Sequence, residues 1–257
     1  MQRIMDTAVT DMVMATVTAS SMGIFGFFNS KVSLRESGVL RGACDRHSHI
    51  LFGVDDGIKT IEDSLEAIAA EESMGIKELW CTPHIMEDIP NTSEALRKRF
   101  EQLKAAYTGN ISLNLAAEYM LDTLFEERLA EKDLLVMKDD VVLVETSTIT
   151  PPFDMLGQLR EVQKNGYTPL LAHPERYRYM DKEDYEELVR MGVKLQLNLP
   201  SIAGYYGKTA HEKASWMLSK EMYSAVGTDC HRVKALGEPY SRELISKDDI
   251  RNLEKIL

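Results

Sequence analysis

The sequence predicts an α/β fold in which short parallel strands alternate with helices. Seven short apolar segments are each followed by a segment whose apolar residues have helical spacing. Successive strands begin roughly 25 to 35 residues apart, which is the room that a parallel strand with a crossover helix needs. Most of the strands are rich in Val, Leu and Ile, as in a sheet covered by helices. Such a repeat closes either as a barrel or as an open doubly wound sheet.

The first three strand–helix units are predicted at residues 42–47 with 60–74, 78–82 with 93–107, and 111–118 with 123–131. The first helix has Thr60 as N-cap and Asp63 at its third position, an acidic variant of the capping box. Gly75 ends this helix, since glycine readily adopts the left-handed conformation found there. In the third strand, apolar residues alternate with polar ones up to Glu118, as in a strand with one buried face.

The last four units are predicted at residues 141–145 with 153–165, 168–172 with 182–191, 194–198 with 209–220, and 223–228 with 248–256. The strand that closes on Glu145 is a continuous apolar run, which is typical of a buried parallel strand. Gly166 and Gly192 follow two of the helices and are expected to end them.

Length and composition limit the class of protein. A chain of 257 residues with 44% hydrophobic residues can bury one large core, so residues 25–257 are assigned to a single domain. Residues 1–24 lack the basic start and clean apolar block of a signal peptide, and we expect a leader that is disordered or weakly helical. No apolar run reaches the length of about 18 residues that a transmembrane helix needs.

Charge and cysteine usage indicate a compartment and exclude one class of partner. The formal net charge of −11 argues against nucleic-acid binding, which needs a basic face. The cysteines Cys44, Cys81 and Cys230 have no C-x-x-C spacing and suit a reducing compartment, so we expect a cytoplasmic protein. They alternate away from the polar strand ends and are interpreted as small core residues.

Side chains that bind metals stand at the ends of six of the seven predicted strands. The segment His47-Ser48-His49 places two imidazoles on one face of the first strand, where one ion can use both. The full set is His47, His49, Asp56, His84, Glu118, Glu145, His173, Asp229 and His231. Five of the six histidines belong to it, and the sixth, His211, is expected to be exposed on a helix. Because the carboxyl ends of parallel strands meet at one edge, these groups are predicted to form one cluster.

A cluster of eight or nine nitrogen and oxygen donors exceeds one tetrahedral site. It suits two or three divalent ions of the manganese, iron or zinc type. Such ions lower the pKa of a bridging water, hold a phosphoryl oxygen and stabilise the charge of an in-line displacement. Arg176 lies three residues after His173 and can offer a planar fork to phosphate, although a surface arginine paired with Glu175 is the competing interpretation. Arg232, next to His231, is a second candidate.

Other catalytic motifs are not found. None of the cysteines is followed by the arginine of a Cys-x5-Arg phosphatase loop, and no Gly-x-Ser-x-Gly elbow is present. No G-x-G-x-x-G follows a strand and no Walker loop occurs, so nothing favours a dinucleotide site.

Five segments carry a resemblance to a known family: Asp45-Arg-His-Ser-His-Ile-Leu, Val54-Asp-Asp-Gly, Cys81-Thr-Pro-His, Ala172-His-Pro-Glu-Arg-Tyr and Gly227-Thr-Asp-Cys-His. They resemble the polymerase and histidinol phosphatase (PHP) superfamily. Within it they resemble the manganese-dependent bacterial protein-tyrosine phosphatases of capsule and exopolysaccharide synthesis. The Asp-Asp-Gly and His-Pro-Glu-Arg blocks are specific to this branch, whereas His-x-His alone is not.

The resemblance implies a distorted seven-stranded (β/α) barrel of the TIM-like PHP fold, with three metal ions. The implied ligand groups are His47, His49 and Asp229; Glu118, Glu145 and His173; and Asp56, His84 and His231. Glu118 would bridge the first two ions and act in catalysis with Arg176, which would bind the substrate phosphate. The residues after His231 lack the arginine that some members carry a few positions later, so the second phosphate contact would come from Arg232 or Lys234. Manganese is the expected metal, with iron or zinc as alternatives.

The implied function is a phosphotyrosine-protein phosphatase that acts on the tyrosine-rich tail of a membrane-anchored bacterial tyrosine autokinase controlling polysaccharide export. Two alternatives stay open: a small-molecule phosphomonoesterase such as histidinol phosphatase, and a non-catalytic barrel that binds metal or a kinase. The segments 87–92 and 198–207 are expected to separate the first two, since a rim at 203–207 could accept a peptide. Assembly into a homo-oligomer is also left open, since no sequence signature indicates it.

Overall fold

Parallel strands surrounded by helices form the part of the chain that the computed structural model describes, residues 31–257. The predicted leader at 1–24 lies outside these residues. The strands are β1 (Cys44–Ser48), β2 (Glu78–Cys81), β3 (His84–Ile85), β4 (Ser112–Leu115), β5 (Glu118–Met120), β6 (Val141–Glu145), β7 (Thr168–Ala172), β8 (Lys194–Asn198) and β9 (Tyr223–Gly227). All strand pairs within the sheets are parallel, which confirms the predicted α/β class.

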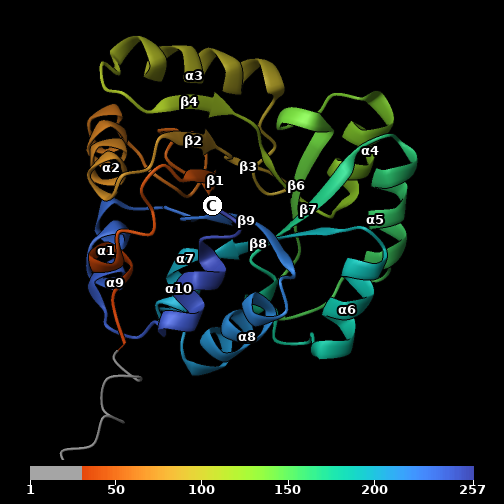
Figure 1. Cartoon of the computed structure of the whole chain (residues 1–257). Coiled ribbons are helices and arrows are strands. Elements are labelled where there is room, and N and C mark those ends of the chain that lie inside the picture. The colour runs from red at the N-terminus through yellow and green to blue at the C-terminus, as the bar shows by residue number, and fades with distance from the viewer. Residues whose placement is uncertain (1–30) are drawn as a thin grey trace, which may run out of the picture. The chain divides into compact units, whose positions relative to one another are not determined.

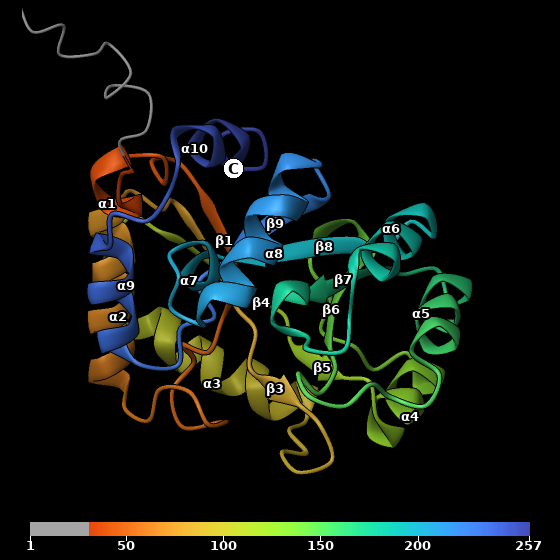
Figure 2. The ribbon, with the colours of Figure 1, turned by 90° about the horizontal axis from the view of Figure 1, so that it is seen from below.

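The helices follow the strands in the predicted order. They are α1 (Leu34–Ser37), α2 (Ile61–Met74), α3 (Ser93–Ala106), α4 (Thr123–Glu131), α5 (Met155–Lys164), α6 (Lys182–Arg190), α7 (Leu199–Ile202), α8 (Lys208–Ser219), α9 (Glu238–Ser241) and α10 (Lys247–Leu253). The long helices lie outside the strands (Figures 1 and 2). The short helices α1, α7 and α9 were not predicted, because four residues are too few to show a helical period.

Local sequence signals explain where the helices begin and end. The Thr60 side chain accepts a hydrogen bond from the backbone N–H of Asp63 at 3.2 Å, so the predicted N-cap of α2 is confirmed. Gly75 ends α2 with a φ of 96°, a conformation that favours glycine. The Asp181 and Ser246 side chains close capping boxes at the starts of α6 and α10.

Strand pairing divides the strands into two sheets, with orders β1-β2-β4 and β3-β5-β6-β7-β8-β9. The prediction of one continuous strand over 111–118 is wrong, because the chain leaves the first sheet after β4 and enters the second at β5. A similar break separates β2 from β3 at Pro83, which has no N–H to donate to a ladder. The Pro83 carbonyl still accepts a hydrogen bond from the Glu118 N–H at 3.1 Å, so the two breaks lie side by side.

The ends of β1 and β9 are also joined by backbone hydrogen bonds. The Asp229 N–H donates to the His47 carbonyl at 2.8 Å, and the His49 N–H donates to the Cys230 carbonyl at 3.1 Å. Ser48 and Cys230 form an isolated parallel bridge. This contact brings the first and last strands together at the edge where the histidines lie.

Residues 31–257 pack as one unit around buried leucine, isoleucine and valine side chains. Cys81 and Cys230 are buried and Cys44 is half-buried, all three as free thiols, in agreement with their interpretation as small core residues. Within these described residues, no helix is long and apolar enough to cross a membrane.

Candidate metal centre

The side chains predicted as metal ligands converge from strands, and from the loops after strands, that are far apart in the sequence. His84 and Glu118 begin the short strands β3 and β5, which follow the breaks after β2 and β4. His47 lies on β1, His84 on β3 and Glu118 on β5. Glu145 ends β6, and His49 and His173 directly follow β1 and β7. The loops after β1 and β9 carry the remaining members, Asp56, Asp229 and His231. Most of them are buried, whereas Asp56 is exposed and His231 is half-buried. The cluster is therefore sealed at its base and opens to solvent on one side.

Glu118 lies at the centre of this cluster. Its Oε2 atom is 3.2 Å from Nε2 of His47, 3.1 Å from Nε2 of His49 and 3.1 Å from Nδ1 of His84. Its Oε1 atom is 3.3 Å from Nε2 of His173. Although both oxygens are buried, neither makes a hydrogen bond of acceptable geometry within the described residues. A buried carboxylate in this state is costly unless a cation binds it.

The spacing of these atoms matches that of donors around one metal ion. Donors about 2.1 Å from an ion stand about 3.0 Å apart in octahedral geometry and about 3.4 Å apart in tetrahedral geometry. The contacts of Glu118 with the imidazoles, 3.1 to 3.3 Å, lie within this range. Imidazole and carboxylate donors without thiolate suit manganese, iron or zinc. The residues present therefore fit divalent cations.

Four groups of donor atoms are close enough to share an ion: His49, Asp56, His84 and His231; His47, His49 and Asp229; His47, Glu118 and His173; and His84, Glu118 and Glu145. Two of the three groups that the family resemblance implies lie together: His47, His49 and Asp229 form one, and Asp56, His84 and His231 lie in another. The third implied group is divided, because Glu118 shares one group with His173 and a different one with Glu145. Glu118 takes part in two groups, as a bridging carboxylate does. His49 also lies in two groups, and it joins the set around Asp56, His84 and His231.

Electrostatics in the cluster favour positive charge. Burial alone would lower the pKa of His47, but the carboxylates of Glu118 and Asp229 raise it to about 9. Burial would also lower the pKa of His49, but Asp55 and Glu118 raise it well above its usual range. Burial would raise the pKa of Glu118 and Asp229, yet the surrounding imidazoles hold both well below their usual range. The carboxylates thus remain charged, and the cluster favours cations beside them.

Two further residues orient the histidines and were not predicted to do so. The Asp55 Oδ2 atom is 2.8 Å from Nδ1 of His49, and Asp55 also accepts from the N–H groups of Gly57 and His84. The Gln196 Oε1 atom is 2.8 Å from Nδ1 of His47. Both contacts engage Nδ1 and leave Nε2 to face the cluster. The sequence did carry a signal for the role of Gln196, because it is a polar residue inside the apolar strand β8, which supplied no metal ligand of its own.

Arg176 faces the cluster from a short 3-10 turn, Pro174–Arg176, that directly follows His173. Its Nη1 atom is 2.6 Å from Oδ2 of Asp229, and its guanidinium carbon lies 4.4 Å from the centre of the Tyr206 ring. Glu175 points elsewhere: its carboxylate is buried and accepts hydrogen bonds from the Asn198 N–H and the Tyr223 hydroxyl. The competing interpretation, a surface arginine paired with Glu175, is therefore wrong.

Two members of the cluster sit on left-handed backbone. His173 has a φ of 37° and Asp229 a φ of 51°, and neither is a glycine. Such backbone is uncommon for residues other than glycine, although aspartate and histidine adopt it more readily than most. At His173 the turn directs the chain from β7 into the segment that carries Arg176.

The remaining predicted residues lie at the rim. Arg232 is exposed and lines a 670 Å³ pocket together with Arg176, Tyr205 and Tyr206. This pocket opens onto Asp229 and His231, so the two arginines and the metal cluster share one cavity. His211, expected to be exposed, is instead half-buried on α8, with Nδ1 2.8 Å from the Ile202 carbonyl oxygen. It lies outside the donor groups of the described residues.

The chain is similar to known proteins over most of its length. Residues 43–244 match the family model "Capsular polysaccharide synthesis, CpsB/CapC". The tyrosine-protein phosphatase CpsB of Streptococcus agalactiae is 28% identical over 244 residues, covering 83% of this chain and 97% of the relative. The tyrosine-protein phosphatase YwqE of Bacillus subtilis is 31% identical over 202 residues, covering 74% and 78%. A solved structure also matches, with a TM-score of 0.71 and 27% identity over 82% of this chain and 86% of that chain. Its description names YwqE from Bacillus subtilis and CpsB from Streptococcus pneumoniae as unique metal-dependent tyrosine phosphatases.

Proposed function

Since this chain belongs to the capsular polysaccharide synthesis CpsB/CapC family, we propose that it is a metal-dependent protein-tyrosine phosphatase of capsule or exopolysaccharide synthesis. The observation that carries the proposal is the buried cluster around Glu118, with Arg176 held against Asp229 at its open side. We further propose that the substrate is the phosphotyrosine tail of a bacterial tyrosine autokinase.

The proposed metal ligands are the nine side chains of the cluster, and Glu118 is the proposed bridge between ions. Two or three divalent ions are proposed, with manganese preferred over iron or zinc because carboxylate donors accompany the imidazoles. When bound, such ions supply an activated water at neutral pH and neutralise charge on the phosphoryl oxygens. Asp55 and Gln196 hold the imidazoles of His49 and His47 in the orientation that this binding requires.

Arg176 is proposed to grip the phosphoryl group. One of its nitrogens bonds to Asp229, which fixes the guanidinium plane and leaves other N–H groups facing the pocket. Asn198 donates to the same Asp229 oxygen at 2.9 Å and so holds the carboxylate in place. Tyr205 and Tyr206 line the same pocket and provide aromatic surface for the phenyl ring of a phosphotyrosine. Arg232 is proposed as the second phosphate contact.

We also propose a closed barrel and a cytoplasmic location for this chain. The backbone bonds between β1 and β9, and the paired breaks at β2–β3 and β4–β5, support one distorted seven-stranded barrel formed from the two sheets. Three free thiols support a cytoplasmic location, where a reducing environment keeps them unpaired. The tail of a kinase anchored in the membrane would be reached there.

The test is phosphate release from a tyrosine-phosphorylated kinase tail and from histidinol phosphate, measured side by side with manganese and with chelator. We expect release that chelator abolishes and that favours the peptide. Preference for histidinol phosphate would keep the chemistry and overturn the protein substrate. Binding of the tail without any phosphate release at saturating manganese would leave a non-catalytic barrel instead.

The role of Glu118 is tested by Glu118→Gln, which keeps the shape of the side chain and removes the charge. We expect turnover to fall by at least a factor of about 100, since the bridging group is lost while the fold remains. His173→Ala should behave in the same way, and circular dichroism checks that both variants are folded. Full activity in either variant would contradict the assignment.

A further inference from the structure

Three neighbouring pockets lie at the mouth of the metal cluster, and the outer two each share lining residues with the central one. Together they are called the depression. The central pocket of 670 Å³ contains Arg176 and the two tyrosines. A pocket of 480 Å³ shares Asp56, His231, Arg232 and Lys234 with it and extends to Lys59. A pocket of 230 Å³ on the other side shares Arg176 and Tyr206 and extends to Arg178 and Lys213. The depression therefore offers more space than a single phosphotyrosine side chain requires.

Positive side chains line this depression from end to end: Lys59, Arg176, Arg178, Lys213, Arg232 and Lys234. Of these, only Arg176 forms a salt bridge within the described residues. Arg178, Arg232 and Lys234 are exposed, so their charges are available to a ligand. The whole chain carries a net charge of −11, so six cations along one depression stand out against their surroundings.

The acidic side chains of the depression do not cancel these cations. Asp56 and Asp229 belong to the metal cluster, and Glu175 is buried with both carboxylate oxygens hydrogen-bonded. The acids left to face solvent there are Asp63 at one end and Glu238 in the centre. Lys213 donates to the carbonyls of Tyr177 and Met180 and keeps one N–H free.

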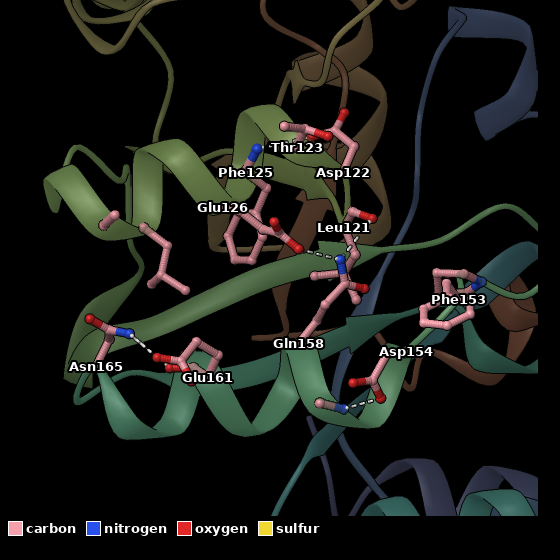
Figure 3. Close-up of a pocket in the computed structure, with 14 residues that line it drawn as sticks. Leu121, Asp122, Thr123, Phe125, Glu126, Phe153, Asp154, Gln158, Glu161 and Asn165 are labelled. Atoms are coloured by element: carbon pink, nitrogen blue, oxygen red, sulfur yellow. Dashed lines mark hydrogen bonds between the residues drawn. The ribbon is translucent and has the colours of Figure 1, made fainter.

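A fourth pocket shows the opposite charge. It measures 640 Å³, lies between α4 and α5, and contains four carboxylates and no lysine or arginine (Figure 3). Asp122 and Asp154 cap the two helices, and Glu126 accepts a hydrogen bond from Gln158 across the pocket. An anionic chain is repelled from this pocket and attracted to the depression at the metal cluster.

We propose that this cationic depression binds a polypeptide that carries further anionic groups, carboxylates or phosphates, on both sides of the target phosphotyrosine. The proposal rests on the phosphatase function and adds two flanking subsites to it. Lys59 with Lys234 forms one subsite, and Arg178 with Lys213 forms the other. A small phosphomonoester fills only the central pocket and gains nothing from either flank.

The experiment uses four peptides of equal length with one central phosphotyrosine. Their flanks are neutral (Gly and Ser), glutamate before the phosphotyrosine only, glutamate after it only, or lysine on both sides. The ratio kcat/KM is measured for each, with p-nitrophenyl phosphate as the small substrate, and binding of fluorescein-labelled peptides is measured by anisotropy. We expect each glutamate flank to raise kcat/KM about two- to fivefold over the neutral peptide, the range that one exposed ion pair supplies.

The variants Lys59→Gln and Arg178→Gln should each remove the advantage of one glutamate peptide and leave that of the other. Hydrolysis of p-nitrophenyl phosphate should not change in either variant. The matched controls are Lys194→Gln and Arg160→Gln, because both residues are exposed and lie outside the depression. Lys194 is the first residue of β8, away from Asn198, and Arg160 is on α5. Asp63→Asn should strengthen the preference on the Lys59 side, which tests that subsite without disturbing a cation.

Equal kcat/KM for neutral and glutamate peptides would overturn the flanking subsites while the phosphatase function stood. Preference for the lysine peptide would also overturn them and would direct attention to the pocket between α4 and α5. If p-nitrophenyl phosphate and every peptide resisted hydrolysis, the phosphatase function would fail. The anisotropy measurements would still decide whether anionic flanks bind, because they do not depend on turnover.

Discussion

Asp55 is the residue whose position explains most about the cluster. One of its oxygens accepts from the imidazole of His49 and from the His84 N–H, and the other accepts from the Gly57 N–H. These bonds, together with the charge on His49, lower its pKa to about 2 although burial alone would raise it. Asp55 thus stays charged and orients two proposed ligands from behind.

Replacing Asp55 by asparagine should weaken metal binding by a factor of about 10 to 100. The amide keeps the shape of the carboxylate but loses the charge that fixes the His49 imidazole. Isothermal titration with manganese measures the effect. Asp88→Asn, a change at an exposed carboxylate outside the donor groups, is the control. Equal affinity in Asp55→Asn and the parent protein would remove Asp55 from this role.

The raised pKa of His47 predicts how the stability of the metal-free protein changes with pH. His47 has a pKa of about 9 in the folded state, above the value of about 6.5 in an unfolded chain. Its contribution to stability is therefore complete below about pH 6.5 and is lost as the pH rises towards 9. The loss from this residue alone is on the order of 3 kcal/mol.

Chelator-treated protein should accordingly become less stable between about pH 6.5 and 9. The metal-bound protein should gain stability over the same window, because metal ligation needs neutral imidazoles. Urea unfolding at several pH values, with manganese and with chelator, measures both trends. A metal-free protein that is equally stable at the two ends of this window would contradict the assignment.

Among the elements, β9 lies directly against β1 at Gly227. A Cβ at this position would lie 2.5 Å from the Cβ of His47 and 2.7 Å from Nε2 of Gln196. Glycine is needed here because the backbone of β9 lies directly against a proposed ligand and the side chain that orients it.

The change Gly227→Ala should separate β9 from β1 and destabilise the protein by about 1 to 3 kcal/mol, as overpacking does in a filled core. It should also weaken manganese binding, since His47 and Gln196 are both displaced. Urea unfolding and metal titration measure the two effects. Ser224→Ala, an exposed position on the same strand, is the control and should alter neither.

For the whole molecule, the proposed ions act as cross-links between strands that begin and end the chain. His47 and Asp229 are far apart in the sequence, yet they lie in one donor group. Ions that bind only the folded chain stabilise it by about 2.7 kcal/mol at a concentration 100 times the dissociation constant. Chelation should therefore lower the melting temperature by roughly 5 to 10 °C. Differential scanning fluorimetry measures this shift, and the same shift in Glu118→Gln would argue against Glu118 as a bridge.

The sequence by itself determined the α/β class, most element positions and the set of polar residues at the strand ends. These follow from local periodicity and from one rule of topology, that the carboxyl ends of parallel strands meet at one edge. Because His47, Glu118 and Asp229 each stand at the end of a predicted strand or directly after it, their convergence could be predicted without knowing any long-range contact.

Only the tertiary structure decided which atoms meet. The pairing of Arg176 with Asp229 rather than Glu175, and the contacts of Gln196 and Asp55 with the imidazoles, depend on side-chain directions after the strands have packed. The breaks at β2–β3 and β4–β5 depend on how two sheets share the same chain segments. The cationic depression combines residues from 59 to 234, whose charges are scattered along the sequence and become one surface only when the loops fold together.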